Sequence, residues 1–180
     1  MALTYRVDDA GLQIEFSFTN QEPLTEAHLS FGLHPGFAVS SIAEADILLP
    51  RGTYIRHWAR GNFLDGRQDA IPFEGGPMPF AKENLPDSYL LGISGVPERR
   101  FKLRDVTAGR EVVLDFGDCP FLTLWSDGGA FVCIEPCWGL ADSQPQRPFE
   151  EKVGIQRIAP GETLEASFRI EPRLLNCPKE

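Results

Sequence analysis

The chain has 180 residues and a formal net charge of −9, and 42% of its residues are hydrophobic. This length suits one domain, residues 1–180, with a substantial core. The acidic balance argues against nucleic acid and against anionic membrane surfaces, because both need basic patches on the protein. The sequence shows neither a signal-peptide pattern nor an apolar run of about 18 residues, so we expect a cytoplasmic protein that does not span a membrane.

Alternation of apolar and polar residues is the main pattern along the chain. It is clean over Leu12–Phe18 and over Leu164–Ile170, and it recurs over Val112–Phe116. Side chains on a strand alternate between two faces, so each segment predicts a half-buried strand. Residues 8–11 (D-D-A-G) predict the turn of a hairpin that joins Leu3–Val7 to the first of these strands. Glycines and prolines punctuate the strands and no helical periodicity is evident, so the sequence predicts an all-β antiparallel protein.

A histidine ends the next apolar segment, which reads S-F-G-L-H-P-G-F. His34 stands directly before Pro35, and a proline restricts the residue that precedes it to extended backbone. A His-Pro pair alone is more often a structural turn than a site. The other histidines, His28 and His57, have no partner in the sequence, and we expect them at the surface or in loops.

Two long stretches, residues 58–80 and residues 138–152, lack a clear strand pattern and are rich in Gly, Pro and polar residues. We expect both to be loops, and loops of this length in a compact domain tend to serve function.

Glu135 closes an unusually apolar run, F-V-C-I-E-P. Alternation puts Glu135 on the same face as Phe131 and Cys133, where a carboxylate is rarely buried unless it is paired or used. Because Pro136 lacks a backbone N–H, we expect the strand to end here with the carboxylate at its rim. The alternative is an ordinary surface glutamate at a strand end.

His34 and Glu135 are about a hundred residues apart, so only the fold can bring them together. A group that can donate a proton near neutral pH and a carboxylate that can accept one are the usual means of moving protons on a substrate. We therefore predict that the two side chains form an acid–base pair.

The cysteines are Cys119, Cys133, Cys137 and Cys177. They are too few and too irregularly spaced for a disulfide framework, and we expect reduced thiols, most of them in the core. The spacing of the middle two is not that of a zinc ribbon and no histidine stands near them in the sequence, so no metal site is predicted.

Three segments occur in a specific order: G-L-H-P-G-F, then C-I-E-P-C-W-G-L-A-D, then E-K-V-G-I-Q-R-I-A-P-G-E. In this the chain resembles the galactose mutarotase-like superfamily, and within it the aldose 1-epimerase relatives of the LacX type. The resemblance covers nearly the whole chain and implies an antiparallel β-supersandwich. Family members are usually longer before the first strand, so the resemblance also implies a sandwich that lacks the N-terminal strands.

The resemblance further implies an isomerase that interconverts the α and β anomers of a free aldose, with no cofactor and no metal. The family's general acid falls on His34, its general base on Glu135, and its sugar-binding aspartate roughly on Asp87, for which a turn-forming role is the alternative. Phe37 and Trp138 flank the pair and offer flat apolar faces to a sugar ring, although core packing explains them equally well.

A second function stays open: a carbohydrate-binding protein with the same fold and little or no turnover. Its motivation is the missing N-terminal segment, which in the family contributes sugar-holding groups that help to position the substrate. Missing strands would also leave sheet edges unpaired and apolar faces uncovered. We therefore expect a homo-oligomer formed through exposed sheet edges or an uncovered sheet face, or else a partner that supplies the missing strands.

Overall fold

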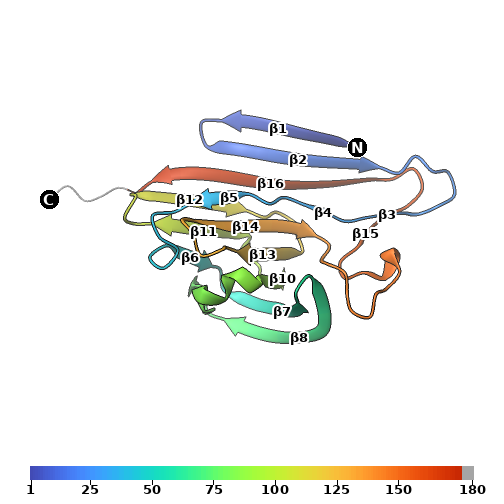
Figure 1. Ribbon diagram of the computed structural model, residues 1–180. Coiled ribbons are helices and arrows are strands. Elements are labelled where there is room, and N and C mark those ends of the chain that lie inside the picture. The colour runs from blue at the N-terminus through green and yellow to red at the C-terminus, as the bar shows by residue number, and fades with distance from the viewer. Residues whose placement is uncertain (176–180) are drawn as a thin grey trace.

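The computed structural model describes residues 1–175 and consists of two main antiparallel sheets that face each other across a core (Figure 1). The first sheet has the strand order β1 (Ala2–Asp8), β2 (Gly11–Thr19), β16 (Thr163–Leu174), β12 (Arg110–Asp115), β11 (Arg100–Asp105), β6 (Asp46–Leu49) and β9 (Gly76–Pro77).

The second sheet holds the candidate site. Its order is β4 (Phe31–Gly32), β14 (Phe131–Trp138), β13 (Phe121–Trp125), β10 (Tyr89–Gly95), β7 (Gly52–Arg60) and β8 (Phe63–Phe73), with β5 (Gly36–Ala38) also paired to β14. A small third sheet pairs β15 (Gln156–Ile158) with β3 (Ala27–Leu29). The helices of the described chain are two short 3₁₀ segments, η1 (Lys82–Asp87) and η2 (Phe149–Glu151), and neither could cross a membrane.

The core between the sheets follows from the alternating pattern of the strands. Ile14 and Phe16 of β2 and Phe168 of β16 are buried and face the second sheet, where Leu91 and Leu124 are fully buried. Each strand thus contributes every second side chain to one apolar layer, whose removal from water stabilises the sandwich. The predicted all-β antiparallel fold is confirmed.

The predicted first hairpin is confirmed as well. β1 and β2 pair in register, and the carboxylate of Asp8 accepts hydrogen bonds from the backbone N–H groups of Ala10 and Gly11 in the turn. Gly11 has a φ of +148°, and a Cβ there would lie 2.0 Å from the carbonyl oxygen of Ile170, so the close approach of β16 requires glycine at this position.

The expectation of a loop over residues 58–80 is wrong. Most of this stretch is the end of β7 and the whole of β8, which form a long hairpin. β8 is at the edge of its sheet and most of its residues are exposed on both faces, so it has no apolar alternation by which to be recognised. Pro72 is tolerated because an edge strand need not donate every N–H. The second predicted loop, residues 138–152, is confirmed apart from Trp138, which ends β14, and the single turn of η2.

β1 forms the outer edge of the first sheet, and all seven of its residues are exposed. Leu3, Tyr5 and Val7 are 42%, 57% and 82% exposed, and their partners in β2 belong to the strand's core-facing side. This edge therefore presents both unpaired backbone groups and apolar side chains.

We expect the chain to self-associate through this edge, with light scattering at micromolar concentration reporting a mass above that of one chain. Val7→Lys should shift the population to monomers, because it places a charge on the apolar face of the edge strand that association would bury. Thr4→Lys is the matched control on the opposite face of β1. A wild-type chain that is monomeric at this concentration would contradict the prediction.

Candidate active site

The site is built on the face of the second sheet that points away from the core. On β14, Val132 and Ile134 point into the core, whereas Cys133 and Glu135 lie on the opposite face, as the alternation predicted. The strand does not end at Glu135, however, but continues to Trp138, which corrects the expectation of a carboxylate at the strand's rim. Glu135 lies in the middle of a strand, on the face of a sheet.

His34 lies in the short connection between β4 and β5, which both pair with β14 along the same edge. Gly32 and Gly36 pair with β14 residues on either side of Glu135, two residues away in each direction. The register therefore places His34 directly opposite Glu135, although the chain between them is about a hundred residues long.

Two backbone hydrogen bonds show which type of antiparallel cross-strand pair His34 and Glu135 form. The N–H of Leu33 donates to the carbonyl of Pro136 at 3.0 Å, and the N–H of Ile134 donates to the carbonyl of Pro35 at 3.4 Å. Bonds that flank a pair in this way mark a non-hydrogen-bonded pair, the type in which opposite side chains come closest. Each proline removes the second bond of its own pair. Pro136 is tolerated inside β14 because its missing N–H faces this interrupted edge.

The predicted acid–base pair is in contact: His34 Nε2 lies 3.3 Å from Glu135 Oε1. The two environments differ, since the His34 side chain is 63% exposed and that of Glu135 is 12% exposed. Burial raises the pKa of Glu135 above its ordinary 4.5, while the nearby His34 acts in the opposite direction. A carboxylate with a raised pKa is a better base than a free one, and an open histidine beside it can exchange protons with solvent.

A row of side chains, polar except for Leu90, extends from this pair across the sheet. Glu135 is opposite Thr123 of β13, Thr123 is opposite Leu90 of β10, and Leu90 is opposite His57 of β7. The expectation that His57 lies at the surface is wrong: it is 8% exposed and its ring meets Phe121 edge-on. Burial lowers the pKa of His57, which favours the neutral ring. Three strand spacings of about 4.8 Å separate β7 from β14, so the backbone of His57 is roughly 14 Å from that of Glu135.

A cleft of about 630 Å³ opens at the Trp125 end of this face, and neither His34 nor Glu135 lines it. Its walls include His57, the predicted sugar residue Asp87 at the end of η1, and Trp125 at the end of β13. The Trp125 ring meets the His34 ring edge-on with centroids 6.1 Å apart, so it joins the cleft to the acid–base pair. Sequence reasoning missed Trp125, although the alternation of F-L-T-L-W places it on the same face as Thr123.

Phe37 and Trp138 lie elsewhere. Phe37 is opposite Val132, on the core face of its sheet, and is partly buried against the core. Trp138 is 2% exposed and its ring is parallel to that of Phe31 with centroids 4.8 Å apart. The expectation that Trp138 offers a face to a sugar is therefore corrected in favour of core packing, because almost none of the side chain reaches the surface.

The loop after β14 covers one end of the site face. Leu140 from this loop packs with Phe121 and Leu64 in a small second apolar cluster. The backbone of Asp142 accepts a hydrogen bond from the N–H of Leu64 at 2.7 Å, and its side chain contacts Lys152. These contacts fix the loop to β8, so the open part of the face is the end that holds Trp125.

The described cysteines, Cys119, Cys133 and Cys137, are unpaired thiols, as expected, and Cys177 lies outside the described residues. Burial raises the pKa of Cys137 to about 11. Cys133 differs from the others because the fold brings a histidine and a glutamate to it. The ligand atoms of Cys133, His34 and Glu135 all lie within 4.8 Å of one another. No histidine stands near Cys133 in the sequence, but the fold places His34 close to it.

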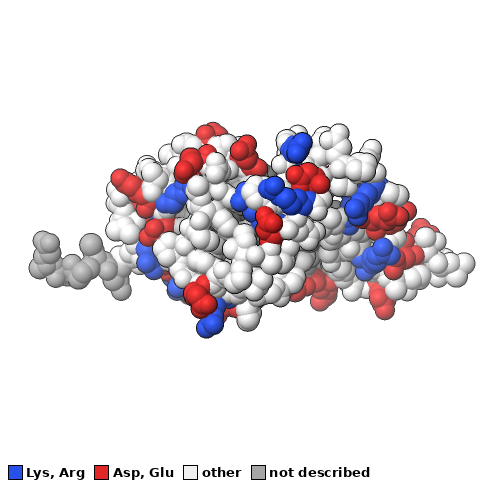
Figure 2. All heavy atoms as spheres, turned by 90° about the horizontal axis from the view of Figure 1, so that it is seen from below, with Lys and Arg blue, Asp and Glu red and all other residues white. Residues whose placement is uncertain are grey.

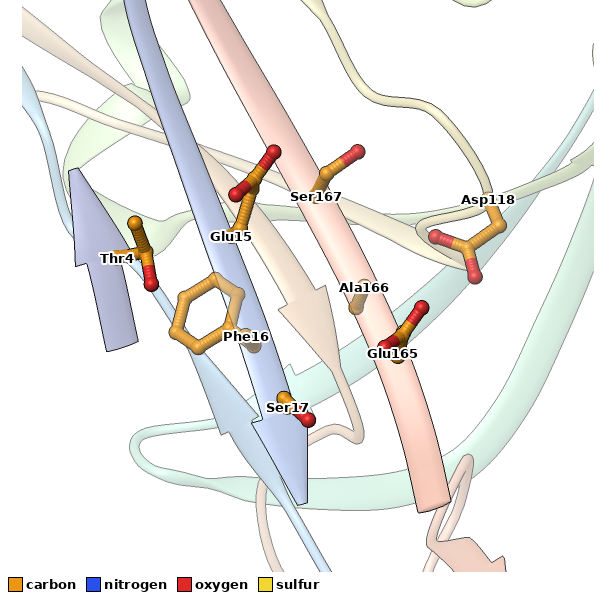
Figure 3. Close-up of a pocket in the computed structure, with 8 residues that line it drawn as sticks. All are labelled: Thr4, Glu15, Phe16, Ser17, Asp118, Glu165, Ala166 and Ser167. Carbon is orange, nitrogen blue, oxygen red and sulfur yellow. The ribbon is translucent and has the colours of Figure 1, made fainter. Parts of the chain in front are cut away.

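A second hollow, of about 550 Å³, lies on the first sheet over β2 and β16 (Figure 3). Its acidic side chains, Glu15, Glu165 and Asp118, come from three separate segments, with serine hydroxyls between them. It contains no histidine and therefore no counterpart to the His34–Glu135 pair. On the face shown in Figure 2, Lys and Arg side chains are interspersed with Asp and Glu, so no broad basic patch forms there.

Comparison with known proteins gives the following relatives. No protein-family model matches the chain. The plasmid and chromosomal forms of protein LacX from Lactococcus lactis subsp. lactis are each 26% identical over 186 aligned residues, which cover 94% of this chain and 60% of LacX. The chain therefore spans about 60% of the length of these curated relatives.

Solved structures agree in fold. A galactose mutarotase-like protein from Lactobacillus casei is 25% identical with a TM-score of 0.80, covering 95% of this chain and 62% of that protein. A galactose mutarotase related enzyme from Lactobacillus acidophilus is 22% identical with a TM-score of 0.81, covering 99% and 63%. A protein from Escherichia coli K12 described as a putative aldose 1-epimerase is 17% identical with a TM-score of 0.67, covering 96% and 60%.

Proposed function

Because this chain has the galactose mutarotase-like fold and is homologous to LacX over about 60% of that protein, we propose that it is an aldose 1-epimerase. The substrate is a free aldose, and the products are its two anomers. The observation that carries the proposal is the 3.3 Å contact between His34 and a largely buried Glu135, with the His34 ring meeting Trp125 of a neighbouring cleft.

The reaction requires only proton transfers. Glu135 takes the proton of the C1 hydroxyl, and His34 gives a proton to the ring oxygen as the bond from that oxygen to C1 breaks. The ring opens to an aldehyde, C1 rotates about the C1–C2 bond, and the reverse transfers close the ring to the other anomer. Both oxygens are bonded to C1, so an acid and a base that lie in contact can reach both.

The cleft supplies the binding side of the proposal. Trp125 offers an aromatic face next to His34, while Asp87 offers a carboxylate that can accept hydrogen bonds from sugar hydroxyls. A mixture of one apolar face and a few polar groups is typical of small-molecule sites.

Polarimetry on freshly dissolved glucose or galactose tests the function. We expect the chain to accelerate the approach to anomeric equilibrium in proportion to its concentration. Sugar binding measured by calorimetry without acceleration would instead support the carbohydrate-binding protein. Neither binding nor acceleration with either sugar would contradict both functions for these substrates.

Asp87→Asn is expected to raise KM by about 10–100-fold with a smaller change in kcat, since it removes a charged acceptor from the bound sugar and leaves the acid–base pair in place. Initial rates against sugar concentration measure both constants. Asp9→Asn, in the exposed turn of the first hairpin, is the matched control. A variant with wild-type KM would assign Asp87 to the turn before β10 and not to the sugar.

A further inference from the structure

The cluster of His34, Cys133 and Glu135 combines the three side-chain types that bind zinc, on one face of the second sheet. Neighbouring thiols are arranged differently: the Cys137 thiol, on the same face of the same strand, contacts the Thr123 hydroxyl at 3.7 Å. Within residues 1–175, His34, Cys133 and Glu135 are the group of three or more His, Cys, Asp or Glu side chains whose ligand atoms lie close enough together to share one metal ion.

The spacing suits one tetrahedral ion. Two N or O ligands at about 2.0–2.2 Å from zinc, with a tetrahedral angle between them, stand about 3.4 Å apart. His34 Nε2 and Glu135 Oε1 are 3.3 Å apart, and Cys133 Sγ is within 4.8 Å of the ligand atoms of both. The thiol therefore has to move by no more than about 1 Å to complete three ligands at ordinary zinc distances.

The surroundings also suit a cation with one open position. His34 is on the solvent side of the cluster, so an ion can enter past it, whereas Cys133 and Glu135 are nearly buried beneath it. Gly36, the residue opposite Cys133, has no side chain over the sulfur. The charges balance, because a bound thiolate and a carboxylate together neutralise a divalent ion, which offsets the cost of burying the carboxylate alone.

We propose that His34, Cys133 and Glu135 form a reversible Zn²⁺ site with three protein ligands and a fourth position open to water. Zinc fits better than Mg²⁺ or Ca²⁺, which prefer six or more oxygen ligands. An ion held there occupies both the acid and the base of the proposed epimerase, so Zn²⁺ acts as an inhibitor. The ligand set stands independently of the epimerase activity, and only the inhibition rests on the proposed function.

Titration with Co²⁺ under reducing conditions tests the site, because a thiolate–cobalt bond gives a charge-transfer absorption that oxygen and nitrogen ligands do not give. The probe is the metal alone, and Zn²⁺ competition against a chromophoric chelator gives the affinity. All proteins carry Cys177→Ser, which removes the thiol outside the described residues. We expect one ion per chain and a thiolate band.

Variants assign the ligands. Cys133→Ser should abolish the thiolate band, and His34→Ala should keep it but weaken Zn²⁺ affinity by at least about tenfold, the lower end of what loss of even an outer-shell partner costs. His34 is largely exposed, so its removal does not threaten the fold. Cys137→Ser is the matched control and should bind as the parent does. No thiolate band in the parent, or a band lost in Cys137→Ser and kept in Cys133→Ser, would overturn the site.

Inhibition is measured separately. Each protein's mutarotation rate with Zn²⁺ is normalised to its own zinc-free rate, and Cys133→Ser should need at least about tenfold more Zn²⁺ for half inhibition. Metal binding with no accelerated mutarotation in the zinc-free parent would sustain the zinc site and contradict the epimerase. Accelerated mutarotation with no metal binding would contradict the zinc site alone.

Discussion

Glu135→Gln is expected to slow catalysed mutarotation by about 10²–10⁴-fold, because glutamine has nearly the same shape but cannot accept the proton of the C1 hydroxyl. The carboxylate is the member of the pair that is buried and held opposite His34 by the strand register, so water cannot easily replace it. Polarimetry with equal amounts of folded protein measures the loss. Glu165→Gln, on an exposed position of β16, should keep the wild-type rate.

The same substitution should not weaken the fold, and this separates a catalytic loss from an unfolding loss. Burial raises the folded-state pKa of Glu135 above 4.5, so the folded chain holds the proton more tightly than the unfolded chain does. As the pH rises from the unfolded-state pKa to the higher folded-state pKa of Glu135, the carboxylate ionises and the free energy of unfolding falls. The lost stability is not regained at higher pH.

Glutamine carries no such charge. Urea midpoints of Glu135→Gln should equal those of the wild type well below pH 4.5 and match or exceed them well above it. Variant activity equal to that of the wild type would remove Glu135 from the mechanism. A variant that is both inactive and much less stable at high pH would show that Glu135 holds the fold together, and the activity loss would then say nothing about a base.

Trp138→Ala is expected to lower the free energy of unfolding by about 3–5 kcal/mol, the range for truncating a large buried aromatic side chain. Trp138 is 2% exposed and packs against Phe31 and Phe16, with centroids 4.8 Å and 5.8 Å away. Truncation would leave a cavity within the aromatic cluster that packs between the two sheets. Urea unfolding followed by circular dichroism measures the change.

Trp138→Phe keeps a ring and should lose less, which makes the comparison useful even when the alanine variant is too unstable to purify. Trp58→Ala is the control, since Trp58 lies on the partly exposed surface of β7 between the guanidinium groups of Arg56 and Arg67. A small loss of stability in Trp138→Ala together with a large loss of sugar affinity would reinstate Trp138 as a sugar contact.

Strands with one buried face were predictable from the sequence. Leu12–Phe18 and Leu164–Ile170 alternate because every second side chain enters the core, and both lie within strands of the structure. β8 was not predictable in the same way, because an edge strand with two exposed faces has no apolar period. His57 was misplaced for a related reason: the neighbours that bury it are across the sheet and not beside it in the chain.

The sequence by itself determined the chemistry that is available: a histidine and a glutamate, each held extended by a following proline, in a chain of half-buried strands. Only the tertiary structure decided that they meet, because the register of β4 and β5 against β14 is set by pairing between segments about a hundred residues apart. It also decided that Cys133 joins them, that Trp125 lines the cleft, and that Trp138 belongs to the core. Local patterns fix which face of a strand a side chain occupies, but which strands become neighbours depends on burying the whole apolar surface at once.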